Sequence, residues 1–255
     1  MLKIRLIAVI LVRDGRVVQS VQFKHTNVIH YDPIHAIESF NQWAIDEMVL
    51  LNVSRDGGAS RDSFVGIVNN ISKKCFVPLC VGGWISDIDY AKTILVNGAD
   101  KLIVNTFAFL HPQFISQLAQ KFGNQCVVVS IDSQQDTNGE EFVVVDRGGR
   151  MTDTGTVEWA CKAEGFGAGE VFINSIDFDG KRNGYNISLI RSVRHAVSIP
   201  VIAMGGVLKW EHLAQGVTEA GADAVAAANI FHYTEQSTRK AKKFLLEKGL
   251  NFRNV

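Results

Sequence analysis

The stretch from Val81 to Thr106, VGGWISDIDYAKTILVNGADKLIVNT, decides the fold, because a second stretch of the chain repeats its plan. From Met204 to Asn229 the chain reads MGGVLKWEHLAQGVTEAGADAVAAAN. In both copies a glycine pair precedes a segment with helical spacing of apolar residues, and Gly-Ala-Asp then precedes a short apolar strand. The glycine pairs lie 123 residues apart, as do the Gly-Ala-Asp triplets, so the sequence predicts two similar halves.

Units of this kind, a β-branched run followed by a loop and an amphipathic segment, recur along the chain. Strands are expected at residues 4–12, 48–53, 76–81, 101–105, 126–132, 170–174, 201–204 and 224–228. Helices are expected at residues 33–46, 87–97, 112–122, 156–165, 185–197, 211–220 and 235–248. Eight such units in about 250 residues predict an α/β fold, a closed (β/α)8 TIM barrel with a half-barrel internal repeat, as a single domain over residues 1–255. A doubly wound open sheet is the alternative.

The composition excludes several classes of protein. With 47% hydrophobic residues the chain can fill a large core, and its 26 basic residues balance 26 acidic ones, which argues against a nucleic-acid partner. The longest apolar run, Leu6–Val12, is far shorter than the ~20 residues of a membrane-spanning helix, so no membrane partner is expected. Four cysteines without metal-type spacing indicate mostly buried thiols in the cytoplasm and predict no metal site and no cofactor: Cys75, Cys80, Cys126 and Cys161.

In a barrel of this kind the loops after the strands build the active site, so residues at those positions are candidates for binding. Gly82-Gly83 with Asn105-Thr106, and Gly205-Gly206 with Ala228-Asn229, follow neighbouring strands in the two halves. Backbone N–H groups of glycine-rich turns can approach an anion closely, so the two sets predict two phosphate sites across the mouth. Tight turns are the alternative explanation for either glycine pair.

Acidic residues at the same end of the barrel are candidates for proton transfer. Asp132 ends the fifth expected strand, where its carboxylate would point into the mouth and exchange a proton with a bound ligand. Asp177 and Asp179-Gly180 follow the sixth strand, with a solvated loop as the alternative. The first loop, residues 13–32, is long enough to be a lid, and we expect it to be mobile.

Four charged residues stand at the opposite end of the expected strands. Glu47, Lys101 and Glu170 begin the second, fourth and sixth strands, and Arg5 lies near the start of the first. Because alternate strands fill one layer of a barrel interior, these side chains can form a neutral ring at the barrel floor. Such a ring would close or gate a route along the barrel axis. Solvated charges at strand starts are the alternative.

Motifs in a fixed order run nearly from one end of the chain to the other: Arg13-Asp14-Gly15, Val81-Gly82-Gly83, Gly98-Ala99-Asp100-Lys101, Asn105-Thr106, Ile131-Asp132, Gly148-Gly149-Arg150, Val157-Glu158-Trp159, Asp177-Phe178-Asp179-Gly180, Gly205-Gly206 and Ile230-Phe231-His232. With this set the sequence resembles the cyclase subunit of imidazole glycerol phosphate synthase, the HisF type. The resemblance implies a barrel that binds a bis-phosphorylated ligand at its mouth and receives ammonia from a HisH-like glutaminase docked on its floor. It also implies that Arg5, Glu47, Lys101 and Glu170 are an ammonia gate.

The sequence departs from the family pattern at the mouth. The resemblance implies two aspartates as general acid and base, on strands one and five; Asp132 is one of them, and Leu11 stands in the place of the other. Leucine cannot carry a proton, and the loss of one member of such a pair typically removes about 10² to 10⁴ in rate. Further departures are Gln19 for a lysine, Asn52 for an aspartate, Trp84 for a glycine, and Met204 and Asn229 for serines.

A retained gate beneath an altered mouth favours a paralogue that takes ammonia from a HisH-like glutaminase and gives it to another phosphorylated acceptor. Relatives of this type are known to supply ammonia for the amidino sugars of surface polysaccharides, so amidination of a nucleotide-sugar or polysaccharide precursor is the expected reaction. An authentic cyclase of histidine biosynthesis is one alternative. A non-catalytic ligand-binding subunit that stimulates the glutaminase is another. The related phosphate-binding isomerase is disfavoured because it lacks the gate.

Overall fold

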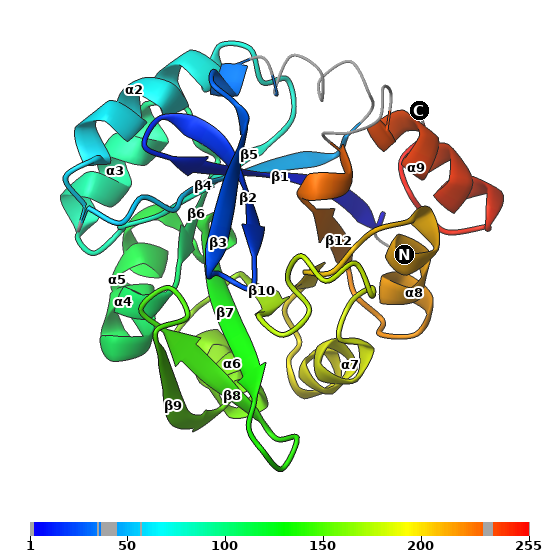
Figure 1. Cartoon of the computed structure of the whole chain (residues 1–255). Coiled ribbons are helices and arrows are strands. Elements are labelled where there is room, and N and C mark those ends of the chain that lie inside the picture. The colour runs from blue at the N-terminus through cyan, green and yellow to red at the C-terminus, as the bar shows by residue number, and fades with distance from the viewer. Residues whose placement is uncertain (1–2, 35, 37–44, 57, 232–236, 255) are drawn as a thin grey trace.

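Eight parallel strands close into a barrel, which confirms the predicted fold class (Figure 1). The computed structural model describes residues 3–34, 36, 45–56, 58–231 and 237–254. The last barrel strand pairs with the first and closes the ring, and all eight pairings are parallel. In barrel order the strands are β1 (Arg5–Arg13), β4 (Glu47–Asn52), β5 (Leu79–Gly82), β6 (Lys101–Val104), β7 (Val127–Gln135), β10 (Glu170–Ser175), β11 (Val201–Met204) and β12 (Ala224–Ala227).

Helices surround the barrel and cover its outer face (Figure 1). They are α2 (Arg61–Ser72), α3 (Ile88–Val96), α4 (Thr106–Leu110), α5 (Gln113–Phe122), α6 (Thr156–Gly165), α7 (Ile187–Ala196), α8 (Trp210–Thr218) and α9 (Ser237–Glu247), with short 3-10 turns η1 (Asn124–Cys126) and η2 (Asn229–Phe231). Within the described ranges, none of these helices has the length and apolar character needed to cross a membrane. The expected helix at residues 33–46 lies largely outside the described residues.

Two expectations about these elements are wrong. The helix α2 was not expected, although its buried residues Phe64, Val68 and Ile71 have helical spacing, because a glycine and two asparagines interrupt its apolar residues. The strand expected at residues 76–81 begins only at Leu79. Phe76 is 85% exposed, and the proline at position 78 has no N–H to give to a neighbouring strand.

Two β-hairpins extend the barrel at its mouth. β2 (Arg16–Val21) and β3 (His25–His30) follow β1, and β8 (Glu141–Val145) and β9 (Arg150–Gly155) follow β7. Because β1 and β7 are barrel strands one and five, the hairpins occupy equivalent places in the two halves. Most of the first loop is therefore a hydrogen-bonded hairpin, and its expected mobility stays a prediction.

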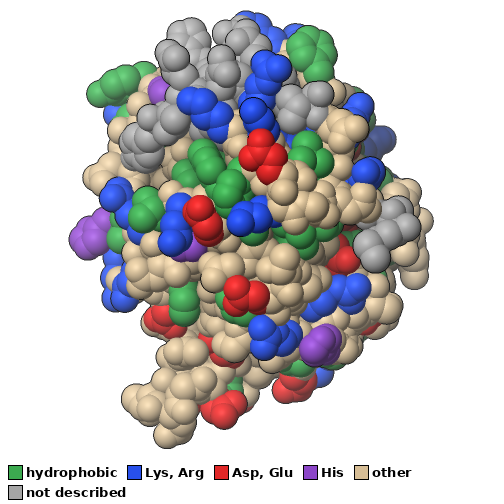
Figure 2. Space-filling view, turned by 90° about the vertical axis from the view of Figure 1, so that its right-hand side faces the viewer, with side chains coloured by type: hydrophobic (Ala, Val, Ile, Leu, Met, Phe, Trp, Pro, Cys, Tyr) green, Lys and Arg blue, Asp and Glu red, His purple; other side chains and the backbone are tan. Residues whose placement is uncertain are grey.

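The apolar core has two compartments separated by the barrel wall. The outer compartment lies between the strands and the helices. The inner compartment fills the barrel with side chains from all eight strands: Ile7, Val9, Val49, Cys80, Ile103, Val128, Phe172, Ile202, Met204, Ala224 and Ala226. Cys80 is buried there, whereas Cys161 on α6 is exposed, so the expectation of mostly buried thiols is wrong for Cys161. Acidic and basic side chains are interspersed over the face that carries α8 and α9, in keeping with a formal net charge of zero (Figure 2).

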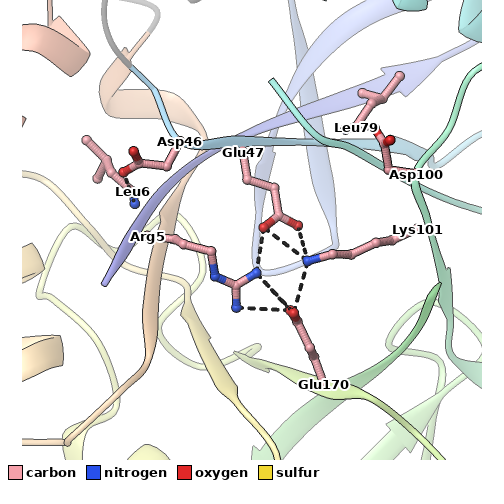
Figure 3. A network of polar contacts seen from close by, with 8 residues as sticks. All are labelled: Arg5, Leu6, Asp46, Glu47, Leu79, Asp100, Lys101 and Glu170. Carbon is pink, nitrogen blue, oxygen red and sulfur yellow. Dashed lines mark hydrogen bonds and ion pairs between the residues drawn. The ribbon is translucent and has the colours of Figure 1, made fainter. Parts of the chain in front are cut away.

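The aspartates that precede three barrel strands explain part of the half-barrel repeat. Asp100 accepts the N–H of Leu79 at 2.8 Å through its carboxylate, and its own N–H donates to the Leu79 carbonyl at 2.8 Å. Asp223 makes the same two bonds to Val201, each 3.0 Å long. Asp46 makes the same two hydrogen bonds to Leu6, near the start of β1 (Figure 3). The carboxylate thus supplies an acceptor for the first N–H of a strand at the barrel floor.

Replacing Asp223 by alanine is expected to lower the free energy of unfolding by about 1–3 kcal/mol, because the N–H of buried Val201 loses its acceptor. Urea unfolding followed by circular dichroism measures the loss. Asp223→Asn keeps an acceptor oxygen and should lose clearly less. Equal losses in the two variants would contradict the view that the acceptor oxygen of Asp223 is the source of the stability.

Candidate active site

Asp132 lies at the mouth end of β7, and two amides hold its carboxylate. Asn105 Nδ2 donates to Asp132 Oδ2 at 2.7 Å, and the Asn174 amide donates to the same carboxylate. The Asp132 residue is 7% exposed, and this burial raises its pKa to about 7 although both amides act to lower it. A carboxyl group that titrates near neutral pH can both accept and release protons under physiological conditions.

Leu11 belongs to the inward-facing row of β1 and packs, partly buried, against the inner core. It lies in register with Leu51 of β4 and Val18 of β2, so its surroundings on the strand are apolar. Its side chain offers no group that could exchange a proton. The charge of Asp179 raises the pKa of Asp132 further, but that carboxylate is engaged with another part of the chain.

Asp179 is hydrogen-bonded to the β2–β3 hairpin, which crosses the barrel mouth (Figure 1). Ser20 Oγ donates to Asp179 Oδ2 at 2.8 Å, and the backbone N–H groups of Gln22 and Phe23 donate to the same carboxylate. Burial raises the pKa of Asp179 above its ordinary value, and these three donors oppose the rise. The predicted role of Asp179 in binding a ligand stays a prediction, since its hydrogen bonds here hold the hairpin to the β10–α7 loop.

Residues from the second half of the barrel line one pocket of ≈ 310 Å³ at the mouth. Arg182 contributes a cation to this pocket, and Met204 an apolar wall. A Cβ atom on Gly206 would lie 2.1 Å from the Gly184 carbonyl oxygen, so only glycine fits there. The pocket brings together six of the residues predicted to bind phosphate or substrate: Asp179, Gly180, Gly205, Gly206, Ala228 and Asn229.

The glycine pair of the first half does not line this pocket, and its neighbours are committed to internal contacts. Gly83 packs against Asn52, whose carbonyl oxygen would lie 2.4 Å from a Cβ atom at position 83. Asn105 donates a hydrogen bond to Asp132, and Thr106 Oγ1 accepts a hydrogen bond from the N–H of Asp146 at 3.0 Å. The structure therefore separates Gly82, Gly83, Asn105 and Thr106 from the second set, and a phosphate at either place stays a prediction.

Four charged side chains at the barrel floor form a closed ring of ion pairs (Figure 3). Arg5 Nη1 lies 2.5 Å from Glu47 Oε2 and 3.1 Å from Glu170 Oε1. Lys101 Nζ lies 3.0 Å from Glu47 Oε1 and 2.9 Å from Glu170 Oε1. Burial acts to lower the pKa of Arg5 and of Lys101, but the charges of the two glutamates outweigh it and raise both pKa values. The ring is thus neutral, and its cations stay protonated at physiological pH.

The barrel interior above this ring is apolar. Cys80 lies close enough to experience the charges of all four ring residues, and burial raises the pKa of its thiol well above the ordinary value. The inner core, which includes Ile7, Val49 and Phe172, extends from there toward the mouth. An apolar interior excludes ions, because desolvating a charge is costly, and admits a small neutral molecule more readily.

Sequence reasoning missed several residues of the mouth, including Arg182 in the pocket. Asn174 lies inward with Glu170 and Phe172 in the period-two alternation of β10, which is a signal that could have identified it. Ser20 gave no such signal, because its contact with Asp179 joins residues 159 positions apart. Across the described part of the chain, no group of three or more histidine, cysteine, aspartate or glutamate side chains could hold a metal ion.

Comparison with known proteins places this geometry in a family. A model of the histidine biosynthesis protein family matches residues 5–237. A chain of Vibrio vulnificus (strain YJ016), provisionally named imidazole glycerol phosphate synthase subunit hisF2, is 42% identical over 99% of this chain and 92% of its own length. The imidazole glycerol phosphate synthase subunit HisF of Bacillus licheniformis is 41% identical over 98% of each chain. The chain therefore belongs to the histidine biosynthesis protein family and is a HisF-like synthase subunit.

Proposed function

We propose that this subunit takes up ammonia at the barrel floor from a HisH-like glutaminase and delivers it at the mouth to a phosphorylated acceptor outside histidine biosynthesis. The acceptor would be a nucleotide-sugar or a surface-polysaccharide precursor that becomes an amidine. The complex would act in the cytoplasm. The observation that carries the proposal is the contrast between the closed ionic ring at the floor and the mouth, where β7 carries the ionisable Asp132 and β1 carries the apolar Leu11.

The floor supports the uptake of ammonia. A ring of two cations and two carboxylates blocks the barrel axis to water and ions while its ion pairs are closed. When one pair opens, a neutral ammonia molecule would move between the apolar side chains above the ring without the desolvation cost of an ion. Arg5, Glu47, Lys101 and Glu170 would then act as the gate.

The mouth supports the transfer of nitrogen. For an amidine to form, the oxygen on the electrophilic carbon of the acceptor must first be activated as a phosphate ester, which a separate ATP-using amidotransferase would do. As ammonia bonds to that carbon, the activated oxygen leaves as phosphate, and the incoming nitrogen becomes positively charged and must release a proton. The carboxylate form of Asp132, which predominates above pH of about 7, can accept that proton. Asn105 and Asn174 would keep the carboxylate in place during the step.

An authentic cyclase of histidine biosynthesis is the second candidate function. The observation that favours it is the 41% identity with the HisF chain of Bacillus licheniformis over 98% of each protein. In that case a group other than residue 11 would share proton transfer with Asp132.

Complementation and turnover separate the two functions. Expression of this chain, with a HisH-type glutaminase, in a bacterium lacking its own HisF should fail to restore growth without histidine, whereas the Bacillus licheniformis chain should restore it. The purified subunit supplied with ammonium ions should likewise convert the histidine-pathway intermediate at least 100-fold more slowly than that relative, given the loss of one proton-transfer group. Restored growth together with relative-like turnover would refute the proposal.

A further inference from the structure

Two aromatic rings and two guanidinium groups meet at the rim of the barrel mouth, and none of them lines the pocket described above. We call these residues the rim cluster: Phe23 from the β2–β3 turn, Arg55 from the β4–α2 loop, Trp84 from the β5–α3 loop and Arg147 from the β8–β9 turn. Arg55 Nη2 donates to the Phe23 carbonyl at 3.0 Å, and the guanidinium carbon of Arg147 lies 5.3 Å from the centroid of the Trp84 ring. Four separate loops thus converge on one surface.

Trp84 has a backbone conformation that bulky residues rarely adopt, with φ of 59°. All the described non-glycine residues with positive φ lie in loops at the mouth: Asp14, Gln22, Phe23, Trp84, Asp146, Arg147 and Arg182. Those in the hairpin turns have the conformation that tight turns require. Trp84 does not lie in a hairpin turn, so turn geometry does not explain its positive φ. Residues with a strained backbone of this kind concentrate at functional sites. The chain keeps a large ring where a glycine would fit without strain, so we infer that the ring has a purpose.

Contacts on both sides hold Trp84 in place. Its Nε1–H donates to the Ser54 carbonyl at 3.1 Å, and its own carbonyl accepts a hydrogen bond from the Arg61 guanidinium. Arg61 is anchored in turn by Asp87 at 2.8 Å. Trp84 and Phe23 remain half-buried, whereas Arg55 and Arg147 are exposed. The cluster therefore presents fixed planar surfaces and solvent-accessible cations to an incoming molecule.

This combination of groups selects one class of ligand. Aromatic faces and guanidinium planes stack on nucleobases, and guanidinium groups bind phosphate oxygens through paired N–H donors. A nucleoside phosphate would use both kinds of group, the rings for its base and the cations for its phosphate. We propose that the rim cluster is a stacking site for the base of a nucleoside phosphate, so that the acceptor of the reaction carries a nucleotide. The assignment of the nucleotide to the acceptor rests on the proposed function. Binding of a nucleotide to the rim cluster requires neither ammonia nor the glutaminase.

Calorimetric titration of the full chain with uridine 5′-monophosphate and adenosine 5′-monophosphate tests the site, with ribose 5-phosphate as the probe that has the phosphate without a base. Both nucleotides should bind about tenfold or more tightly than ribose 5-phosphate. Trp84→Gly removes the ring, and relief of the positive φ offsets part of the lost contacts, so the variant should still fold and should bind the nucleotides roughly 10- to 100-fold more weakly. Trp84→Phe keeps an aromatic face and should retain most of the affinity.

A matched pair of variants controls for the loss of a cation. Arg147→Ala removes the cation above Trp84 and should weaken nucleotide binding about tenfold. Lys248→Ala removes a cation that lies 5.5 Å from the Phe244 ring on α9 and should leave binding unchanged. Equal affinity for ribose 5-phosphate and the nucleotides, or unaltered nucleotide affinity in Trp84→Gly, would overturn the proposal. Restored growth together with relative-like turnover would refute the proposed function and leave this binding result standing, so the two failures are distinguishable.

Discussion

Replacement of Asp132 by asparagine is expected to reduce turnover about 10²- to 10⁴-fold, in whichever acceptor reaction the wild type supports, because it removes the ionisable group of the mouth. The amide is nearly isosteric with the carboxylate, so the barrel should keep its structure. The wild-type rate should rise with pH and level off above about 7, where the carboxylate form predominates. Rates measured at a constant concentration of free ammonia test both expectations.

The same substitution is expected to stabilise the fold at alkaline pH. The folded-state pKa of Asp132 is about 7, above the ordinary value of 3.8, so the folded protein binds more protons than the unfolded chain between these values. The stability that this group contributes is therefore present at low pH and lost as the pH rises toward 7. Asparagine carries no charge to desolvate, and roughly 2 kcal/mol of stabilisation, or about 4–8 °C in Tm, is expected at pH 8.

Thermal unfolding of the wild type and Asp132→Asn at pH 5 and pH 8 measures this effect, and the difference in Tm should shrink at pH 5, where the wild-type carboxyl is protonated. Other titrating groups are common to both proteins and cancel in the comparison. Undiminished turnover of Asp132→Asn would show that Asp132 does not accept the proton in this reaction.

Replacement of Glu47 by glutamine is expected to lower the free energy of unfolding by about 3–5 kcal/mol, which is roughly 10 °C in Tm. The Glu47 side chain is 2% exposed and bridges Arg5 and Lys101. Without its charge, two partly buried cations face a single remaining carboxylate, Glu170, and their desolvation is compensated less fully. Equilibrium unfolding in urea measures the loss.

A surface pair serves as the control for this prediction. Lys162 and Glu158 on α6 are 2.6 Å apart but about half exposed, with side-chain accessibilities of 53% and 57%. Glu158→Gln should therefore cost less than about 1 kcal/mol. The double variant Glu47→Gln/Lys101→Gln restores a neutral ring and should recover part of the stability, which a double-mutant cycle would quantify. A loss as small as that of Glu158→Gln would show that the ring behaves like a surface ion pair.

Most of the fold was predictable because it depends on local signals. The strands β1, β7 and β11 lie within a few residues of their predicted positions, since runs of β-branched residues between turn signals are recognisable within a short window. The hairpin β2–β3 was read as a loop, because its pairing needs partners from β1 and across its own turn. The helix α2 was missed for a related reason: only docking onto the barrel shows which of its scattered apolar residues are buried.

The candidate site was predictable to a lesser degree. Their positions at the starts of the expected strands predicted that Arg5, Glu47, Lys101 and Glu170 could meet at the barrel floor, and the structure brings them into one ring. The glycine pairs looked equivalent in sequence, yet only Gly205 and Gly206 line the pocket. In the first half, side chains near the glycine pair are hydrogen-bonded to other strands, as Asn105 is to Asp132 of β7.

The sequence by itself determined the barrel, its two similar halves and the positions of charged residues at the strand ends, because these properties depend on residue spacing along a few turns of chain. Only the tertiary structure decided what those residues do to one another. Closure of the barrel brought Arg5 into contact with Glu170, 165 positions away in the sequence, and burial raised the pKa of Asp132 to about 7. Contact and desolvation are set by the closed barrel, and no short segment of the sequence contains them.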